Sequence, residues 1–420
     1  MNNSNKGDPT VSKAGKMYLA MSIFATLTVT GLNAAELKVM SLSGDGELVF
    51  TTPASGSADH HYRVECTTSL VSTAWATRRS ICGVGPSKSV ANLVPDTAPS
   101  MFYRVVSSLN SAVFVDGEYM VIDLSGGTAA STYAVTYYTG AAAVPDGVTN
   151  DVYKTTKLVM RRIPKGTFTM GARATDYPEA AGSGLHTVTL TKDFYIGVFE
   201  VTQRQWELVM GNRPSYFNNS SYYATRPVEN VSYYDIRENP ANSDDPAVNW
   251  PANSAVNASS FMGKLRAKTG LSAFDLPTES QWEYACRAGT ATALNTGYNM
   301  TSTSSDPRMD AAGRYYYNGG SGYSQSCATS EATAKVGSCL SNAWGLYDMH
   351  GNVYEWCLDW YGTNPGTVSD PYGAASASFR MLRGGGFYDE APRCSSAIRY
   401  LYYPLIRSGS GGFRAAGTLP

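Results

Sequence analysis

Residues 342–361 read NAWGLYDMHGNVYEWCLDWY and belong to the part of the chain that decides the fold. From Thr290 onward the sequence shows little hydrophobic periodicity of either the helical or the strand kind, and it is dense in Gly, Asn, Ser and Tyr. A large domain with few helices and long ordered loops needs another source of order. The candidates are a bound metal, disulfides, or tightly packed Trp and Tyr side chains.

The residues before this region predict short strands and two helices. The first helix follows Thr202 in the segment EVTQRQWELVM, where a polar cap precedes an apolar face made by Trp206, Val209 and Met210. The strands that we expect around it are Lys157 to Ile163, Thr187 to Leu190 and Phe194 to Val201.

The second helix is predicted within PTESQWEYACRAG, residues 277–289. Thr278 occupies the cap position, and Gln281 stands three residues later, where the partner of a capping box belongs. Gly289 is a typical stop signal. These local signals place both ends of the helix.

The N-terminal part predicts a separate module over residues 36–115, because short alternating runs are divided by turn clusters at the spacing of an all-β sandwich. It resembles the fibronectin-like modules of bacterial surface proteins, which implies a spacer role. Residues 116–150 are strand-like and rich in Gly, Ala and Thr, so we interpret them as a β connector to a domain at 151–420. The alternating runs of the module are Glu47 to Thr51, His61 to Thr67, Lys88 to Leu93 and Met101 to Val106.

The first 35 residues have the pattern of a secretory signal peptide. Lys13 and Lys16 precede an apolar run that ends near Leu32, and the small residues Ala34 and Ala35 follow. A membrane anchor is the alternative, although the run is short for a span. We therefore expect a secreted, periplasmic or cell-surface protein that meets a membrane only through this signal or through a later attachment.

Composition narrows the classes of partner. The 420 residues are 43% hydrophobic and 16% charged, as in a globular chain long enough for two or three domains. The formal net charge is -1. Nucleic-acid binding requires a basic footprint, so that class of partner is excluded.

Four of the seven cysteines form two candidate pairs. Cys66 and Cys82 lie together in the N-terminal module, and Cys327 and Cys339 bracket one polar loop. In an oxidising compartment both pairs could be disulfides.

The other three cysteines are predicted to differ in environment. Cys286 and Cys357 have apolar neighbours in the sequence, so we expect them to be buried and inert. Cys394 has no such context and remains to be explained.

Six segments together resemble the formylglycine-generating-enzyme, or sulfatase-modifying-factor, family. The resemblance covers the chain from about residue 155 to its end. It implies an α+β, C-type-lectin-like fold with few helices and long ordered loops. The segments are IPKGTFTMGA (163–172), HTVTLTKDFYIGVFEVTQRQW (186–206), RPVENVSYYD (226–235), LPTESQWEYACRAGT (276–290), NAWGLYDMHGNVYEWCLDWY (342–361) and RGGGF…GGFRAA (383–416).

The resemblance also indicates whether this chain has the catalytic residues of the family. Catalytic members bind copper(I) between two cysteines after an RGGS segment and oxidise a sulfatase cysteine to formylglycine. Here the second cysteine corresponds to Cys394, the first to Asp389, and the serine to Gly386. A carboxylate beside a single thiol is a poor copper(I) site. We therefore expect no catalytic residue and no copper, with Cys394 as the surviving thiol if the enzyme hypothesis holds.

The iron-dependent sulfoxide synthases resemble this fold but use a histidine cluster. The domain contains only His186 and His350, so a three-histidine iron site cannot be assembled.

The segment DMHGNVYEW corresponds to a calcium loop of the family. The resemblance implies ligation by the Asp348 and Glu355 side chains and by the carbonyl oxygens of Gly351 and Val353. Oxygen ligands that include two carboxylates suit Ca²⁺ in a structural role. The alternative is that the two carboxylates merely pair with nearby amides.

The last forty residues predict a binding face. Between the family's anchor positions lie aromatic and apolar residues that follow no period of 2 or 3.6. An exposed, Tyr-rich patch on a rigid scaffold provides contact area at low entropic cost, whereas burial in the core is the alternative. The candidate ligand-binding residues are Tyr388, Asp389, Arg393, Tyr400, Leu401, Tyr402, Tyr403, Leu405, Ile406, Ser408 and Ser410.

This C-terminal pattern is similar to the variable proteins of diversity-generating retroelements, some of which use the same fold. It implies an exported binding protein for an unknown protein or cell-surface ligand, with a segment rewritten by adenine-directed mutagenesis. The alternatives are a formylglycine-generating oxidase and a structural envelope protein.

Overall fold

The computed structural model describes the backbone of six strands between residues 38 and 109, and the full residues 117–173, 184–239, 241, 247–319, 332–363 and 366–419. The expected signal peptide and Cys327 lie outside these residues. The chain divides into two compact units, Met1–Val115 and Asp116–Pro420. Within the described part, no helix combines the length and apolar character needed to cross a bilayer.

The N-terminal unit contains two three-stranded antiparallel sheets, ordered β1-β2-β5 and β4-β3-β6. In the pair β3–β4, Cys66 lies opposite Ala76 and Cys82 lies opposite His61. The two cysteines are therefore about 17 Å apart along the pair, too far for a disulfide. The predicted Cys66–Cys82 pairing is wrong. The strands are β1 Lys38–Leu42, β2 Leu48–Thr51, β3 His60–Thr67, β4 Ala76–Cys82, β5 Ser87–Val90 and β6 Phe102–Leu109.

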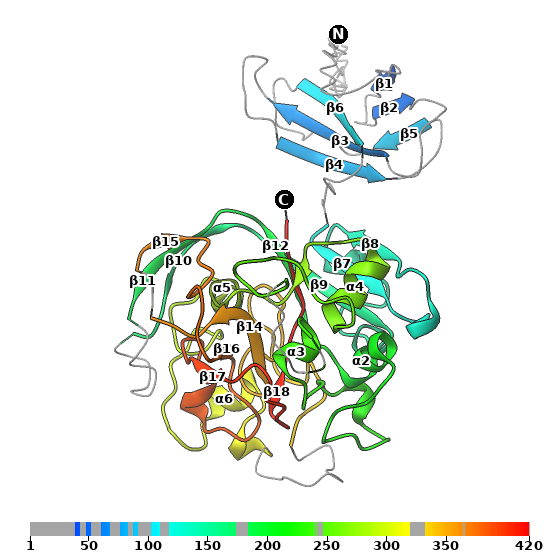
Figure 1. Ribbon diagram of the computed structural model, residues 1–420. Helices are drawn as coiled ribbons and strands as arrows, with labels where there is room; N and C mark the ends of the chain where they lie inside the picture. The colour runs from blue at the N-terminus through cyan, green and yellow to red at the C-terminus, as the bar shows by residue number, and fades with distance from the viewer. Residues whose placement is uncertain are drawn as a thin grey trace, which may run out of the picture. The chain divides into compact units, whose positions relative to one another are not determined.

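The larger unit is built on a six-stranded sheet of order β13-β19-β12-β9-β7-β8. Figure 1 labels β12, β9, β7 and β8 of this sheet. The segment 116–150 contributes β7 and β8 to this sheet. It was expected to be a connector, but it is part of the domain because β7 pairs along its length with β9. The strands are β7 Tyr119–Asp123, β8 Val135–Tyr138, β9 Lys157–Ile163, β12 Phe194–Gly197, β13 Phe274–Asp275 and β19 Ala416–Thr418.

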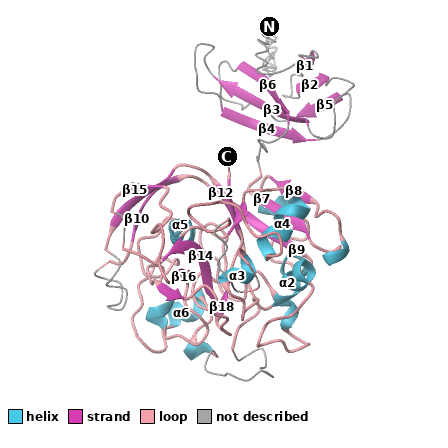
Figure 2. Cartoon of the chain, viewed as in Figure 1, coloured by secondary structure: helices cyan, strands magenta, loops and turns pink. Residues whose placement is uncertain are grey.

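Two smaller sheets complete the domain, and loops fill much of the space between the elements (Figure 2). One has the order β10-β11-β15 and the other β17-β16-β14-β18. Every residue of β14 is buried, including the acidic residues Glu355 and Asp359. The bounds are β10 Gly166–Met170, β11 His186–Leu190, β15 Val368–Ser369, β14 Tyr354–Trp360, β16 Arg380–Arg383, β17 Tyr400–Tyr402 and β18 Gly411–Gly412.

The two predicted helices begin where their caps place them. Thr202 and Thr278 each accept a hydrogen bond from the backbone N–H three residues later, and a glutamine returns the bond in both capping boxes. The sequence did not reveal α3, α4 or α6. The helices are α1 Val152–Thr155, α2 Gln203–Met210, α3 Tyr233–Ile236, α4 Phe261–Thr269, α5 Glu279–Arg287 and α6 Pro307–Ala312.

Packed tryptophans and buried ion pairs hold the loops of this domain. Trp206, Trp282 and Trp356 are almost fully buried. Arg383 and Arg414 are also buried, and each pairs with a buried glutamate. Of the three sources of order considered from the sequence, packed aromatic side chains are present in the core.

Candidate functional site

The C-terminal face comprises the eleven residues predicted to contact a ligand, from Tyr388 to Ser410. Tyr388, Arg393, Tyr403 and Leu405 are exposed, and the other seven are partly buried. The most exposed are Tyr388 (52%), Tyr403 (51%) and Leu405 (49%). The alternative, that these residues belong to the core, does not match their exposure.

Strand β17 carries the centre of the C-terminal face and forms one edge of its sheet. Among the described strands its backbone pairs with β16 alone, with Tyr402 opposite Arg380 and Tyr400 opposite Leu382. The ring of Tyr400 stacks on Tyr354 at 4.7 Å and meets Tyr402 edge-on at 5.2 Å. The buried strands β14 and β16 therefore give these tyrosines a firm support.

Two arginines tie the loops around β17 to the rest of the domain. Arg399 donates to both carboxylate oxygens of Glu279, at 2.6 and 2.9 Å. Arg407 donates to both oxygens of Asp235, each at 2.7 Å. Such two-pronged, charge-assisted contacts fix geometry, so the face lies on an ordered backbone.

The aromatic surface continues beyond the C-terminal segment, which the sequence reasoning missed. Tyr388 meets Tyr316 edge-on at 5.5 Å, and Tyr316 meets Tyr317 at 5.1 Å. Phe387 contacts Phe217 at 5.3 Å, beside the part-exposed Tyr216. The run YYY at 315–317 was a visible signal. Only the fold shows that it lies against Tyr388.

Gly386 lies at the position that corresponds to the serine of the RGGS segment, and it contacts both Asp389 and Cys394. Its N–H donates to Asp389 Oδ2 at 2.8 Å, and Cys394 Sγ donates to its carbonyl oxygen at 3.8 Å. A Cβ on Gly386 would lie 3.3 Å from Ser410 Cβ and 3.4 Å from Tyr354 Cδ2. The two positions that carry the copper thiolates in catalytic relatives are thus brought together here as one carboxylate and one thiol.

The Cys394 thiol does not suit copper(I). The residue is fully buried, and burial together with the nearby Asp389 carboxylate raises the pKa of its thiol well above the ordinary value. A metal ligand must be a thiolate, and copper(I) needs two soft donors. The residues present therefore do not fit a copper centre, and no reaction step is derived through one.

The other two predicted inert thiols are also in the core. Cys286 and Cys357 are fully buried, and burial raises the pKa of Cys286 to about 12. His350 is buried beside them. Its Nδ1 lies 2.7 Å from Cys394 O, its Nε2 accepts from Asn295 N, and burial lowers its pKa to about 4. His350 has a structural position and does not join His186, which contacts Gly184 O.

The four predicted calcium ligands lie around a buried ion pair. Glu355 Oε1 accepts from Arg414 Nη2 at 2.6 Å, and Glu355 Oε2 accepts from Arg414 Nε and Trp282 Nε1. Asp348 Oδ2 accepts from Gly337 N at 2.6 Å. Glu355 and Asp348 therefore accept hydrogen bonds from nearby N–H groups, which is the alternative to calcium ligation considered above.

A further carboxylate, Glu200, joins the same region and was not anticipated. It accepts from Val353 N and Asn352 Nδ2. Burial, with Asp348 and Glu355 nearby, raises the pKa of Glu200 well above its ordinary value. Burial also raises the pKa of Asp348 to about 6.

Burial is the main cause of both raised pKa values, and it favours the neutral form of each carboxyl group. A carboxylate oxygen has two lone pairs, so Glu355 Oε1 and the Asp348 carboxylate can accept further contacts. Ligation of calcium by this set stays a prediction. Among the residues that the structure describes, no group of three or more His, Cys, Asp or Glu side chains is placed to hold a metal ion. The calcium set relies on two carbonyl oxygens instead.

Comparison with known proteins agrees with this architecture. Residues 148–419 match the model of the sulfatase-modifying factor enzyme 1-like domain. The chain is 34% identical to the chaperone protein LppX of Paenibacillus barcinonensis over 218 residues, which are 48% of this chain and 71% of that protein. It is 28% identical to the formylglycine-generating enzyme of Thermomonospora curvata over 300 residues, covering 61% and 92% respectively.

Among solved structures, Treponema denticola variable protein 1 is similar at a TM-score of 0.48 and 28% identity, covering 63% of this chain and 96% of that one. The family match alone spans well over half of the sequence. The mixed α and β content, the few short helices and the long loops are those of this family's C-type-lectin-like fold. The chain belongs to the sulfatase-modifying factor enzyme 1-like domain family.

Proposed function

We propose that this chain is an exported, non-catalytic binding protein whose C-terminal face contacts a protein or cell-surface ligand. One observation carries the proposal: all eleven side chains of the face are accessible, while the backbone beneath them is held by the buried strands β14 and β16. Tyrosines on a rigid support are effective contact residues because they lose little conformational entropy on binding.

The pair Asp389 and Cys394 supports the proposal that the chain is non-catalytic. The oxidase chemistry of the family needs two thiolates, and this chain offers one buried thiol with a raised pKa. We therefore expect no oxidation of a sulfatase-type cysteine peptide by the purified protein, with or without added copper.

Oxygen uptake and peptide mass measured in the presence of copper(I) test this expectation. Asp389→Cys supplies a second thiol beside Gly386 and should raise copper(I) affinity at least tenfold in a competition titration. Asp389→Ser is the matched control and should leave it unchanged. Turnover by the unmodified protein would overturn the non-catalytic proposal.

We also propose that a retroelement diversifies the C-terminal face. Adenine-directed mutagenesis of the Asn codons AAC and AAT preserves the final pyrimidine, so mutated positions should end in C or T. Every Tyr and Asp codon ends in C or T, so the Tyr and Asp positions cannot test the proposal. The informative positions are Leu401, Leu405, Ile406, Ser408 and Ser410.

The gene sequence is the measurement. Pyrimidine endings at these five codons, together with a near-copy of the segment beside a reverse transcriptase gene, are expected. Several purine endings would refute diversification and leave the binding proposal resting on the exposed tyrosines. Glu390 has codons that end in purines, so it lies outside the mutated set or derives from another codon.

A further inference from the structure

A cavity opens in the domain, and none of its lining residues belongs to the C-terminal face. Its volume is about 430 Å³, within the range of roughly 300–1,000 Å³ that is typical of ligand pockets. It lies at the β13–β19 edge of the six-stranded sheet, between the start of α5 and two loops. Its lining includes Lys192, Trp250, Arg266, Asp275, Asp370, Tyr372 and Thr418.

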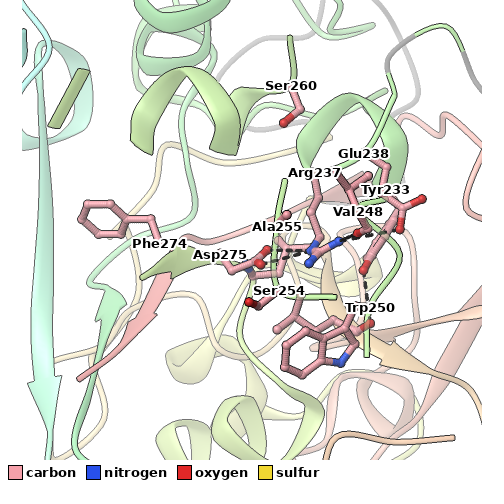
Figure 3. A network of polar contacts seen from close by, with 12 residues as sticks. Tyr233, Arg237, Glu238, Val248, Trp250, Ser254, Ala255, Ser260, Phe274 and Asp275 are labelled. Atoms are coloured by element: carbon pink, nitrogen blue, oxygen red, sulfur yellow. Dashed lines mark hydrogen bonds and ion pairs between the residues drawn. The ribbon is translucent and has the colours of Figure 1, made fainter. Parts of the chain in front are cut away.

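The back wall of the cavity is a network of buried charges. Asp275 accepts from Arg237 Nε at 3.0 Å and from Arg266 Nη2 at 3.0 Å, so one carboxylate is shared by two guanidinium groups. Figure 3 shows the Arg237 side chain held between Asp275 and Val248. The network fixes the guanidinium planes before any ligand arrives.

Charged side chains of both signs line the cavity. Lys192 and Arg266 contribute two positive charges, and Asp275 and Asp370 contribute two negative ones. Asp275 is already engaged by Arg237 and Arg266, and Asp370 by the backbone N–H and the hydroxyl of Thr191. Because both carboxylates already accept from other groups, the Lys192 ammonium is left to attract an anionic ligand.

Hydrogen-bond donors remain available on the cationic side. A guanidinium has five N–H donors, and Arg266 uses three of them on Phe274 O, Ser254 O and Asp275. Two N–H groups are left for a ligand. Thr418 Oγ1 accepts from Gln281 Nε2 at 2.8 Å, which leaves its own O–H free to donate.

Aromatic rings line the other side of the cavity. Trp250 is half-buried, and its indole N–H donates to Tyr372 O at 3.4 Å. Figure 3 shows Trp250 next to Ser254, below the Arg237–Asp275 pair. A flat or ring-shaped ligand body can pack on such a surface while its charged group reaches Arg266.

We propose that this cavity binds an organic carboxylate whose ring packs on Trp250, with Arg266 and Lys192 receiving the carboxylate. A sugar acid and an aromatic acid share this chemistry. The arginine fork matches a carboxylate, and the hydroxyl of Thr418 provides a further donor for ring oxygens.

Calorimetric titration of the full chain with glucuronate, benzoate, glucose and sulfate tests the proposal. Glucuronate or benzoate should bind with a Kd on the order of 1 mM. Glucose, which lacks the carboxylate, and sulfate, which lacks the ring, should each bind at least tenfold more weakly. Preference for glucuronate would identify a sugar-acid source, and preference for benzoate an aromatic one.

Variants distinguish binding in the cavity from a general effect of surface charge on affinity. Lys192→Ala should weaken the carboxylate ligand at least fivefold, and Trp250→Phe should retain binding within threefold. Lys165→Ala removes an exposed lysine outside the cavity and should have no effect. Failure of both acids to bind, equal binding of glucose or sulfate, or an equal loss in the Lys165 variant would overturn the proposal. None of these results depends on the C-terminal face.

Discussion

Buried ion pairs link distant parts of this domain at the residue scale. Arg414 and Glu355 are both fully buried and share two hydrogen bonds, and Arg383 Nη2 donates one hydrogen bond to the buried Glu283. Removing one partner of such a pair leaves an uncompensated charge and costs roughly 3–5 kcal/mol. The loops of the family domain therefore depend on specific pairs, not on hydrophobic burial alone.

Asp359 predicts a dependence of stability on pH. Burial, with Glu279 nearby, raises the pKa of this carboxyl from 3.8 to about 7. Between pH 4 and pH 7 the folded chain therefore holds a proton that the unfolded chain releases. The free energy of unfolding should fall as pH rises through this window, by on the order of 2–4 kcal/mol from this group.

Urea unfolding of Asp359→Asn at pH 4 and pH 7 checks the sign. The amide oxygen can still accept from Glu279 N, which the carboxylate holds at 2.7 Å, so the fold should persist. The free energy of unfolding of the variant should decline less between these two pH values than that of the parent chain, because the contribution of this carboxyl is removed. Asp146→Asn, at an exposed position, should keep the decline of the parent chain. An unchanged pH dependence in the Asp359 variant would contradict the assignment.

The elements of the domain differ in how they are specified. Helix α5 is specified locally, because the hydroxyl of Thr278 accepts from Gln281 N at 3.2 Å and Gln281 returns a bond to Thr278 N at 3.0 Å. Strand β17 is specified by its neighbour, because backbone pairing with β16 sets its register. Side chains can change on such a strand while its path remains, as a diversified face requires.

Thr278→Ala should lower the free energy of unfolding by about 1 kcal/mol, because the helix loses the acceptor for one of its first N–H groups. Chemical denaturation measures this change. Thr278→Ser keeps the hydroxyl and should remain within about 0.5 kcal/mol of the parent chain. Equal losses in both variants would show that the methyl group, and not the cap, stabilises this position.

Calcium is the prediction that concerns the whole molecule. An ion bound only by the folded state should raise the melting temperature by roughly 5–10 °C at a concentration 100 times its Kd. Asp348→Asn should remove most of this gain. It is a better probe than a change at Glu355, whose loss would also leave Arg414 without its partner.

Thermal melts with calcium, with magnesium and with chelator provide the measurement. Magnesium should have a smaller effect, because it demands a stricter octahedral geometry. A melting temperature that is identical in calcium and in chelator would remove the calcium proposal. Arg414 and the packed tryptophans would then account for the order of the loop.

The sequence by itself determined the features that depend on neighbours in the chain. The caps at Thr202 and Thr278 act over three residues, and β9 has the predicted bounds 157–163. The family and its fold followed from motifs in a specific order. The C-terminal face stays a prediction, made from one short segment in which aromatic and apolar residues lie between the family's anchor positions.

Only the tertiary structure decided which distant residues meet. Glu355 and Arg414 are 59 residues apart, and Glu200 reaches Asn352 over 152 residues. Residues 116–150 entered the sheet through pairing with β9, and Tyr316 came to lie against Tyr388. A local pattern cannot reveal these contacts because the path of the long loops sets them. The buried charges and the cavity at β13 are therefore properties of the folded chain.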